Sequence, residues 1–348
     1  MLKDMSAGVH RLLKGALPGA RGKRLNLALQ GGGAHGAFTW GVLDYLLEDT
    51  RLTFSGISGA SAGAVNAVML ADGLARGGPE EARRRLAEFW RAASLGGGLP
   101  GPQRAVLERV LALFPLGSSP VQLFVDAMSR VMSPYDFNPL NINPLKQLIE
   151  RFVDFDAIRA YRGLDLFVSA TNVRSGRLRV FRREDITADV VMASAALPHV
   201  FRAVEIDGEP YWDGGFTGNP PILPLVAEND DDVLLVQIAP LRRDDTPTSA
   251  REILHRVNEI AFSSSLAAEL RALEFVGRAG RHAPVVNVHR ILLEGLDKRL
   301  SGSRLKNDFD FFALLHRAGR RAARRFLDRH FDAIGHRSTL DLAKETAA

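Results

Sequence analysis

A serine within a glycine-flanked turn is the strongest candidate nucleophile in this chain. Gly59 to Gly63 match the pattern G-x-S-x-G, with Ser61 at its centre, between a short apolar run and an Ala-rich stretch. Such glycines permit the sharp strand-to-helix turn of a nucleophile elbow. The free N–H groups of the following helix favour developing negative charge. The pattern therefore predicts a nucleophilic Ser61. The alternative is a tight turn whose serine only caps the helix.

A glycine run just upstream could bind an anion. Gly31 to Gly36 read GGGAHG, and successive backbone N–H groups in such a loop form a concave nest for an oxyanion or a phosphate. No Gly-Lys-Ser/Thr ending follows, which excludes a P-loop. The G-x-G-x-x-G spacing of Gly31, Gly33 and Gly36 leaves a noncatalytic nucleotide-binding module as one alternative. That module needs an acidic residue about 20 positions on, where this chain has Ser55 to Ser61. The loop is therefore better interpreted as an oxyanion hole for Ser61.

The base that would activate Ser61 has two candidates. Asp213 is followed by two glycines, which let its carboxylate approach another loop, although Asp-Gly is also a common turn. A general Ser-His-Asp esterase would place a histidine late in the chain, and His289, at the end of a predicted apolar strand, fits that order formally. No H-E-x-x-H or similar spacing appears, so we expect no metal and no cofactor.

Two strand–glycine turn–helix units lead the chain. Residues 25–30 and 53–57 read as strands, and each runs through one of the two glycine motifs into a helical pattern. Such units predict an α/β fold with a mainly parallel central sheet. We expect a basic leader over residues 1–24. Residues 25–348 would form one three-layer α/β/α domain, with a helical insertion around 79–160 and an Arg-rich C-terminal helix.

The three motifs, in this order, resemble those of bacterial patatin-like phospholipases. That family carries G-G-G-x-R/K-G, then G-x-S-x-G, then D-G-G/A. The chain has these at residues 31–36, 59–63 and 213–215, and His35 stands where the family has Arg or Lys. The likeness extends from Leu25 to Ala239 and more loosely beyond it.

This resemblance implies a lipid acyl ester hydrolase of the phospholipase A or lysophospholipase type. It would work through an acyl-enzyme intermediate and a Ser–Asp dyad with no histidine. The implied site residues are the nucleophile Ser61, the general base and acid Asp213, an oxyanion hole of Gly31, Gly32 and Gly33, and substrate contacts at Ala62 and His35.

Composition narrows the setting of this reaction. The chain of 348 residues has no cysteine, which excludes a disulfide framework and a Cys nucleophile and fits a reducing compartment. Its net charge of +5 favours anionic headgroups but is too small to argue for nucleic acid. No run of about 18 apolar residues is present, so we expect no spanning helix. We expect a cytoplasmic protein whose partner is its lipid substrate, in peripheral contact with an anionic membrane.

Two segments are candidates for that contact. Residues 121–132 place Phe124, Val125, Met128 and Met132 on one helical face, as an interfacial helix or lid would, or as a core helix would. The stretch from His316 to His330 is rich in arginine and could meet headgroups, although a solvated helix face explains it too. Its arginines are Arg317, Arg320, Arg321, Arg324, Arg325 and Arg329.

Overall fold

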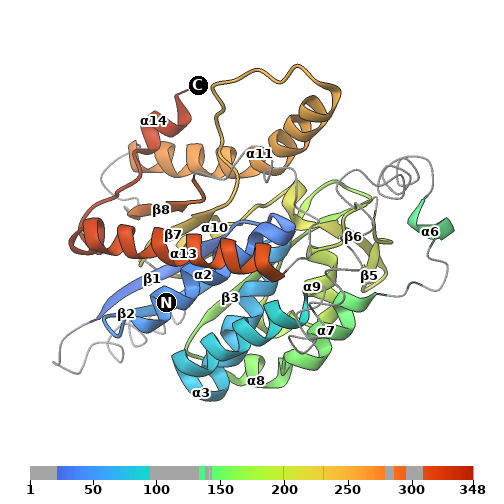
Figure 1. Ribbon diagram of the computed structural model, residues 1–348, viewed down its shortest axis with the longest axis horizontal. Coiled ribbons are helices and arrows are strands. Elements are labelled where there is room, and N and C mark those ends of the chain that lie inside the picture. The colour runs from blue at the N-terminus through green and yellow to red at the C-terminus, as the bar shows by residue number, and fades with distance from the viewer. Residues whose placement is uncertain are drawn as a thin grey trace, which may run out of the picture.

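The computed structural model describes residues 22–94, 133–137, 141, 143–198, 200–229, 231–278, 286–294 and 309–347 (Figure 1). Its strands are β1 (Lys23–Leu29), β2 (Leu52–Gly59), β3 (Asp165–Asn172), β4 (Leu178–Arg182), β5 (Val204–Ile206), β6 (Glu209–Asp213), β7 (Asp232–Gln237) and β8 (Val288–Leu292). The longer helices are α2 (Gly36–Glu48), α3 (Ala62–Ala92), α7 (Pro144–Phe152), α11 (Ala250–Arg278) and α13 (Phe309–His330). The shorter ones are α6 (Pro134–Phe137), α8 (Phe155–Ala160), α9 (Ala188–Ser194), α10 (Leu223–Glu228) and α14 (Leu342–Thr346), with 3-10 turns η1 (Gly33–His35), η2 (Arg183–Asp185), η3 (Gly214–Phe216) and η4 (Phe331–Ala333).

All eight strands belong to one mixed, mostly parallel sheet, as predicted. Paired strands follow the order β5-β6-β3-β2-β1-β7-β8, and β4 also pairs with β3. The pairs β1–β2, β1–β7, β2–β3 and β7–β8 are parallel, whereas β4 and β6 run antiparallel to β3. The carboxyl ends of β1, β2, β3, β7 and β8 therefore lie at one edge of the sheet, which we call the carboxyl edge.

Helices cover both faces of this sheet, which gives three layers (Figure 1). Alternate residues of a strand point to opposite faces. Leu27 and Leu29 of β1 accordingly belong to one buried cluster with side chains of α2, α3 and α13. Ala28 belongs to a second cluster with Leu266 and Leu270 of α11. Burial of both faces explains why the central residues of β7, Val233 to Val236, are all apolar.

Some element boundaries differ from those predicted. β1 begins at Lys23, inside the expected leader. The helical insertion expected from about residue 79 is continuous with the helix that follows β2, and the two form a single element, α3, with a break at Gly78, whose φ of 75° suits glycine. A turn at Asp207-Gly208, where both residues have positive φ, joins β5 to β6. The candidate interfacial segment at 121–132 lies outside the described residues.

Candidate active site

Ser61 lies on the turn between β2 and α3, at the carboxyl edge. Its φ of 53° and ψ of −124° are unusual for a residue with a side chain, and such strain is typical of a nucleophile elbow. The turn also packs tightly against β1. A Cβ atom at Gly63 would lie 2.1 Å from the Leu29 carbonyl oxygen, and one at Gly59 would lie 2.5 Å from the Gly63 carbonyl carbon. Both glycines of G-x-S-x-G are therefore required by close backbone approach.

A second serine stabilises the elbow through a hydrogen bond to its main chain. The Ser61 N–H donates to Ser194 Oγ at 2.9 Å, and Ser194, the last residue of α9, is fully buried. This bond satisfies a main-chain donor at the strained position. Sequence reasoning did not single out Ser194, because a serine in an Ala-rich stretch carries no pattern of its own.

Strand register brings Asp213 to the same place as Ser61. Val168 of β3 pairs with both Gly59 and Phe181, so β2 and β4 lie on opposite sides of β3. Two residues later, Ala170 pairs with both Arg179 of β4 and Asp213 of β6. β6 therefore lies on the same side of β3 as β2 and continues beyond the end of β2. Ser61 also follows Gly59 by two residues, which puts it level with Asp213.

The Asp213 carboxylate is completely buried. Its Oδ1 accepts a hydrogen bond from the Gly215 N–H at 2.7 Å. Burial raises the pKa of Asp213 from 3.8 to about 7, and the Gly215 N–H and the Ser61 hydroxyl oppose this rise only in part. The hydroxyl is thus close enough to affect the carboxylate, although no described group hydrogen-bonds Oδ2 with good geometry. A carboxylate with a pKa near neutrality can accept a proton at physiological pH.

The glycine loop packs directly against the nucleophile Ser61. A Cβ atom at Gly31 would lie 2.8 Å from Ser61 Cβ. The Gly31 N–H, however, donates to Asn219 Oδ1 at 2.7 Å. We expected this group to be one of three oxyanion donors, and the bond to Asn219 removes it from that role. Within the described residues the N–H groups of Gly32 and Gly33 remain available, and η1 begins at Gly33, whose φ is 57°.

His35 and Ala62 flank this loop in different ways. The His35 side chain is 3% exposed, and its ring meets the Phe311 ring of α13 edge to face, with the centroids 5.7 Å apart. It therefore packs into the layer formed by α2 and α13. Ala62 is the first residue of α3, and its Cβ would lie 2.7 Å from a Cβ atom at Gly36. Ala62 thus separates the elbow from the start of α2.

His289 belongs to a different cluster. Its Nε2 lies 2.9 Å from Asp232 Oδ2 and its Nδ1 lies 3.0 Å from Thr339 Oγ1, with the ring fully buried. Asp232 and Val288 are the first residues of β7 and β8, so this cluster lies at the amino edge of the sheet. Ser61 lies at the opposite edge. The alternative triad with His289 is therefore wrong.

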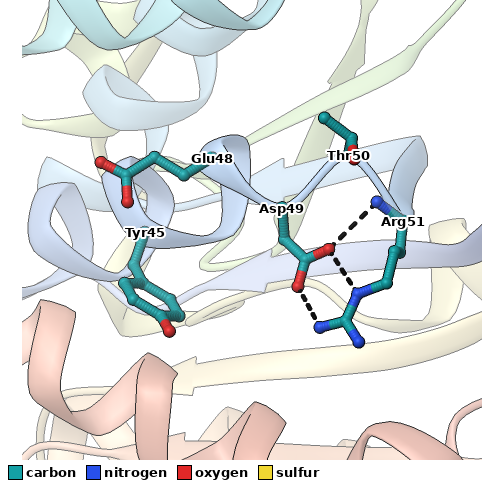
Figure 2. A pocket seen from close by; sticks show the side chains of 5 residues that line it. All are labelled: Tyr45, Glu48, Asp49, Thr50 and Arg51. Atoms are coloured by element: carbon teal, nitrogen blue, oxygen red, sulfur yellow. Dashed lines mark hydrogen bonds and ion pairs between the residues drawn. The ribbon is translucent and has the colours of Figure 1, made fainter.

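A surface hollow at the turn between α2 and β2 is also remote from Ser61. It is lined by Tyr45, Glu48, Asp49, Thr50 and Arg51 (Figure 2). The Arg51 guanidinium and N–H donate to the Asp49 carboxylate, which leaves these charges mutually satisfied. The turn precedes β2 and so lies at the amino edge.

Among the described residues no group of three His, Asp or Glu side chains is arranged to hold a metal ion.

Comparison with known proteins agrees with this geometry. A family model described as patatin-like phospholipase matches residues 27–226, more than half of the chain. The chain belongs to the patatin-like phospholipase family. This patatin-like chain is 29% identical, over 69% of its length, to uncharacterized NTE family proteins of Mycobacterium bovis and Mycobacterium tuberculosis, and the match spans 57% of their length.

Two bacterial proteins of known structure are similar to it. VipD from Legionella pneumophila is 18% identical, with a TM-score of 0.36 over 86% of this chain and 67% of that one. ExoU from Pseudomonas aeruginosa, solved in complex with SpcU, is 17% identical, with a TM-score of 0.39 over 90% of this chain and 52% of that one.

Proposed function

We propose that this patatin-like protein hydrolyses lipid acyl esters, as a phospholipase A or lysophospholipase, through a Ser61–Asp213 dyad. The observation that carries the proposal is the meeting of three features at one edge of the sheet. They are a serine held on a strained elbow, a fully buried carboxylate whose pKa is about 7, and a glycine loop with two available N–H groups. Family membership supports the same class of substrate.

The first half of the reaction acylates Ser61. Its hydroxyl is a weak nucleophile, so Asp213 must accept the proton as the oxygen attacks the ester carbonyl. The attack makes a tetrahedral oxyanion, which the N–H groups of Gly32 and Gly33 would stabilise. Losing one such donor typically costs about 3 kcal/mol of transition-state stabilisation. The protonated Asp213 then gives its proton to the departing alcohol oxygen as the C–O bond breaks.

The second half releases the fatty acid. Water attacks the acyl-enzyme carbonyl while Asp213 again takes the proton. Collapse of the second tetrahedral intermediate breaks the bond to Ser61, whose oxygen recovers the proton from Asp213. Because Asp213 acts first as a base in each half, the ionised form is the active one. Activity should therefore rise with pH through about 7, where Asp213 loses its proton.

A fluorophosphonate probe and lipid product analysis test this mechanism together. The wild-type protein should be labelled at Ser61 and should release fatty acid from phosphatidylcholine or lysophosphatidylcholine, identified by mass spectrometry. Ser61→Ala should not be labelled, and Asp213→Asn should lose at least about 10³-fold in kcat. Lipid turnover by the Ser61→Ala protein would refute the dyad, and a wild-type protein that no probe labels would favour a noncatalytic role for the glycine loop.

Helix α13 presents the best candidate surface for meeting the lipid. Arg320 turns inward to Asp44 and Glu48 of α2, but the other five arginines of this helix are exposed. We call these five the arginine stripe: Arg317, Arg321, Arg324, Arg325 and Arg329. In the described part of the chain one ion pair involves this stripe, in which Arg324 Nε lies 3.7 Å from Asp328 Oδ2.

The arginine stripe has the charge of a surface that meets an anion. Spacings of four residues put like charges next to each other, which destabilises an isolated helix. An anionic bilayer would relieve that repulsion, and each arginine near such a surface contributes about 1 kcal/mol of attraction. We propose that α13 rests on anionic headgroups while the carboxyl edge takes its substrate. No helix in the described ranges is long and apolar enough to cross a bilayer.

Vesicle flotation tests this contact. The triple variant Arg317→Glu, Arg321→Glu and Arg325→Glu should lose at least about 100-fold in affinity for vesicles that contain phosphatidylglycerol, because three contacts of about 1 kcal/mol are lost. A matched triple at exposed arginines elsewhere, Arg177, Arg242 and Arg271, changes net charge equally and should keep binding. Both proteins should hydrolyse a soluble ester normally. The role of the arginine stripe would be refuted if both triple variants lost the same affinity for anionic vesicles. It would also be refuted if wild type bound neutral vesicles as tightly as anionic ones.

A further inference from the structure

Asn219 joins the glycine loop to a helix on the other face of the sheet. Its side chain is 1% exposed. Its Oδ1 accepts the hydrogen bond from the Gly31 N–H at 2.7 Å, and its Nδ2 donates to the Phe262 carbonyl of α11 at 2.9 Å. Its own N–H donates to Ser265 Oγ at 3.1 Å. The two ends of one amide thus connect two segments that are far apart in the sequence.

These partners leave the Asn219 amide a single orientation. A main-chain N–H can only donate, and a carbonyl can only accept, so the oxygen must face Gly31 and the nitrogen must face Phe262. Gly31 begins a run of three glycines, whose backbones are freer than those of other residues. A fixed acceptor at Gly31 therefore limits the directions that the following N–H groups of Gly32 and Gly33 can take.

The same turn of α11 also supports the base. A Cβ atom at Gly215 would lie 2.3 Å from the Phe262 ring, so this ring covers Gly215 closely. The Gly215 N–H is the one that holds Asp213 Oδ1. The Phe262 carbonyl is therefore connected to the glycine loop by hydrogen bonds through Asn219. The Phe262 ring packs against Gly215, whose N–H holds the Asp213 carboxylate. One residue of α11 therefore contacts the supports of both the oxyanion donors and the base.

We propose that Asn219 is the positioning residue of the oxyanion hole, and that it fixes the Gly32 and Gly33 donors by anchoring Gly31 to α11. The inference rests on the proposed function, since it assigns these donors to an ester oxyanion. Asn219 touches neither substrate nor Ser61 in this role. It acts through Gly31, so its loss should weaken transition-state stabilisation and leave Asp213 and Ser61 in place.

The test compares Asn219→Ala with wild type on a soluble p-nitrophenyl ester. We expect kcat to fall about 10–100-fold with little change in KM, because misplaced donors act mainly in the transition state. An alkyl trifluoromethyl ketone forms an oxyanion on Ser61, and its Ki should rise by the same factor. The acid limb of the pH profile should stay where it is in wild type, because Asp213 keeps its surroundings. Fluorophosphonate should still label Ser61, more slowly.

Asn26→Ala is the matched control. Asn26 is also fully buried, and its Nδ2 donates to Asn229 Oδ1 and to the Asp231 carbonyl near the amino edge. It should lose stability but keep kcat. If Asn219→Ala does not fold, Asn219→Asp keeps the volume and an acceptor for the Gly31 N–H but has no donor for the Phe262 carbonyl. The anchor to α11 is then lost, so its kcat should fall as well.

Three results would overturn the role of Asn219. They are a folded Asn219 variant with wild-type kcat, an equal loss of kcat in Asn26→Ala, and a displaced acid limb, which would mean that Asn219 acts on Asp213. A wild-type protein without activity would instead refute the proposed function and would be seen before any variant is made.

Discussion

Replacing Asp213 with asparagine should stabilise the protein at alkaline pH while it removes activity. Burial raises the pKa of Asp213 from 3.8 to about 7, so ionisation of this group above pH 7 opposes folding. In the unfolded chain the same carboxyl titrates near its ordinary value. Between the two pKa values the folded protein holds a proton that the unfolded chain has released. The stability contributed by this proton is present at low pH and is lost as pH rises through about 7.

The size of the effect follows from the pKa. Each pKa unit corresponds to about 1.36 kcal/mol, and pH 5 lies two units below the pKa of about 7. Wild type should therefore lose about 2.7 kcal/mol of stability through this residue between pH 5 and pH 8. Asparagine has no proton to release, so the variant lacks this term. Its amide leaves a buried N–H without a described partner at the position of Oδ2. This lowers the stability of the variant by an amount that does not depend on pH.

Urea unfolding followed by circular dichroism at several pH values measures this difference. The stability of Asp213→Asn minus that of wild type should grow from pH 5 to about pH 7 and then level off. Asp244→Asn, at an exposed position in the loop after β7, should show no such trend. A difference that does not change with pH would refute the raised pKa, and with it the reasoning that makes Asp213 a base near neutrality.

Two further substitutions probe residues on either edge of the sheet. His289→Ala should keep kcat but lose about 3 kcal/mol of stability, because the buried Asp232 carboxylate loses its hydrogen bond to His289 Nε2; a tenfold fall in the kcat of folded protein would restore the rejected triad. Ser194→Ala leaves the Ser61 N–H without its acceptor and should cost about 1–3 kcal/mol of stability. Its kcat should also fall, because the elbow is held less firmly. Thermal melting measures the stability and steady-state kinetics measures kcat. If neither the stability nor kcat changed, the role given to Ser194 would be wrong.

Much of the fold was accessible from local patterns. Glycine turns between apolar runs and helical periodicity predicted two β–α units and a mainly parallel sheet, and both are present. The apolar run Val233 to Val236 of β7 has no polar residue alternating within it, which is typical of a strand buried on both faces. Local patterns do not predict that α3 continues past Gly78. Glycine followed by proline is typical of a helix boundary, and the chain resumes its helix directly after one left-handed residue.

The sequence by itself determined the parts of the site that depend on neighbouring residues. G-x-S-x-G specifies the elbow, since only glycine allows the close approach that Gly63 makes to β1. The glycine run specifies the tight loop that leads into η1. Both are properties of a few consecutive residues and their backbone conformations, which is why they could be read without knowing what lies opposite them.

Only the tertiary structure decided which distant groups complete the site. Asp213 is level with Ser61 because β6 pairs with the side of β3 that β2 leaves open, and His289 is excluded because β8 begins at the other edge. Asn219 takes the Gly31 N–H, and Ser194 takes that of Ser61, from segments with no distinctive pattern. These meetings depend on strand order and register. Those are set by the burial of both faces of the whole sheet, so no single stretch of sequence contains them.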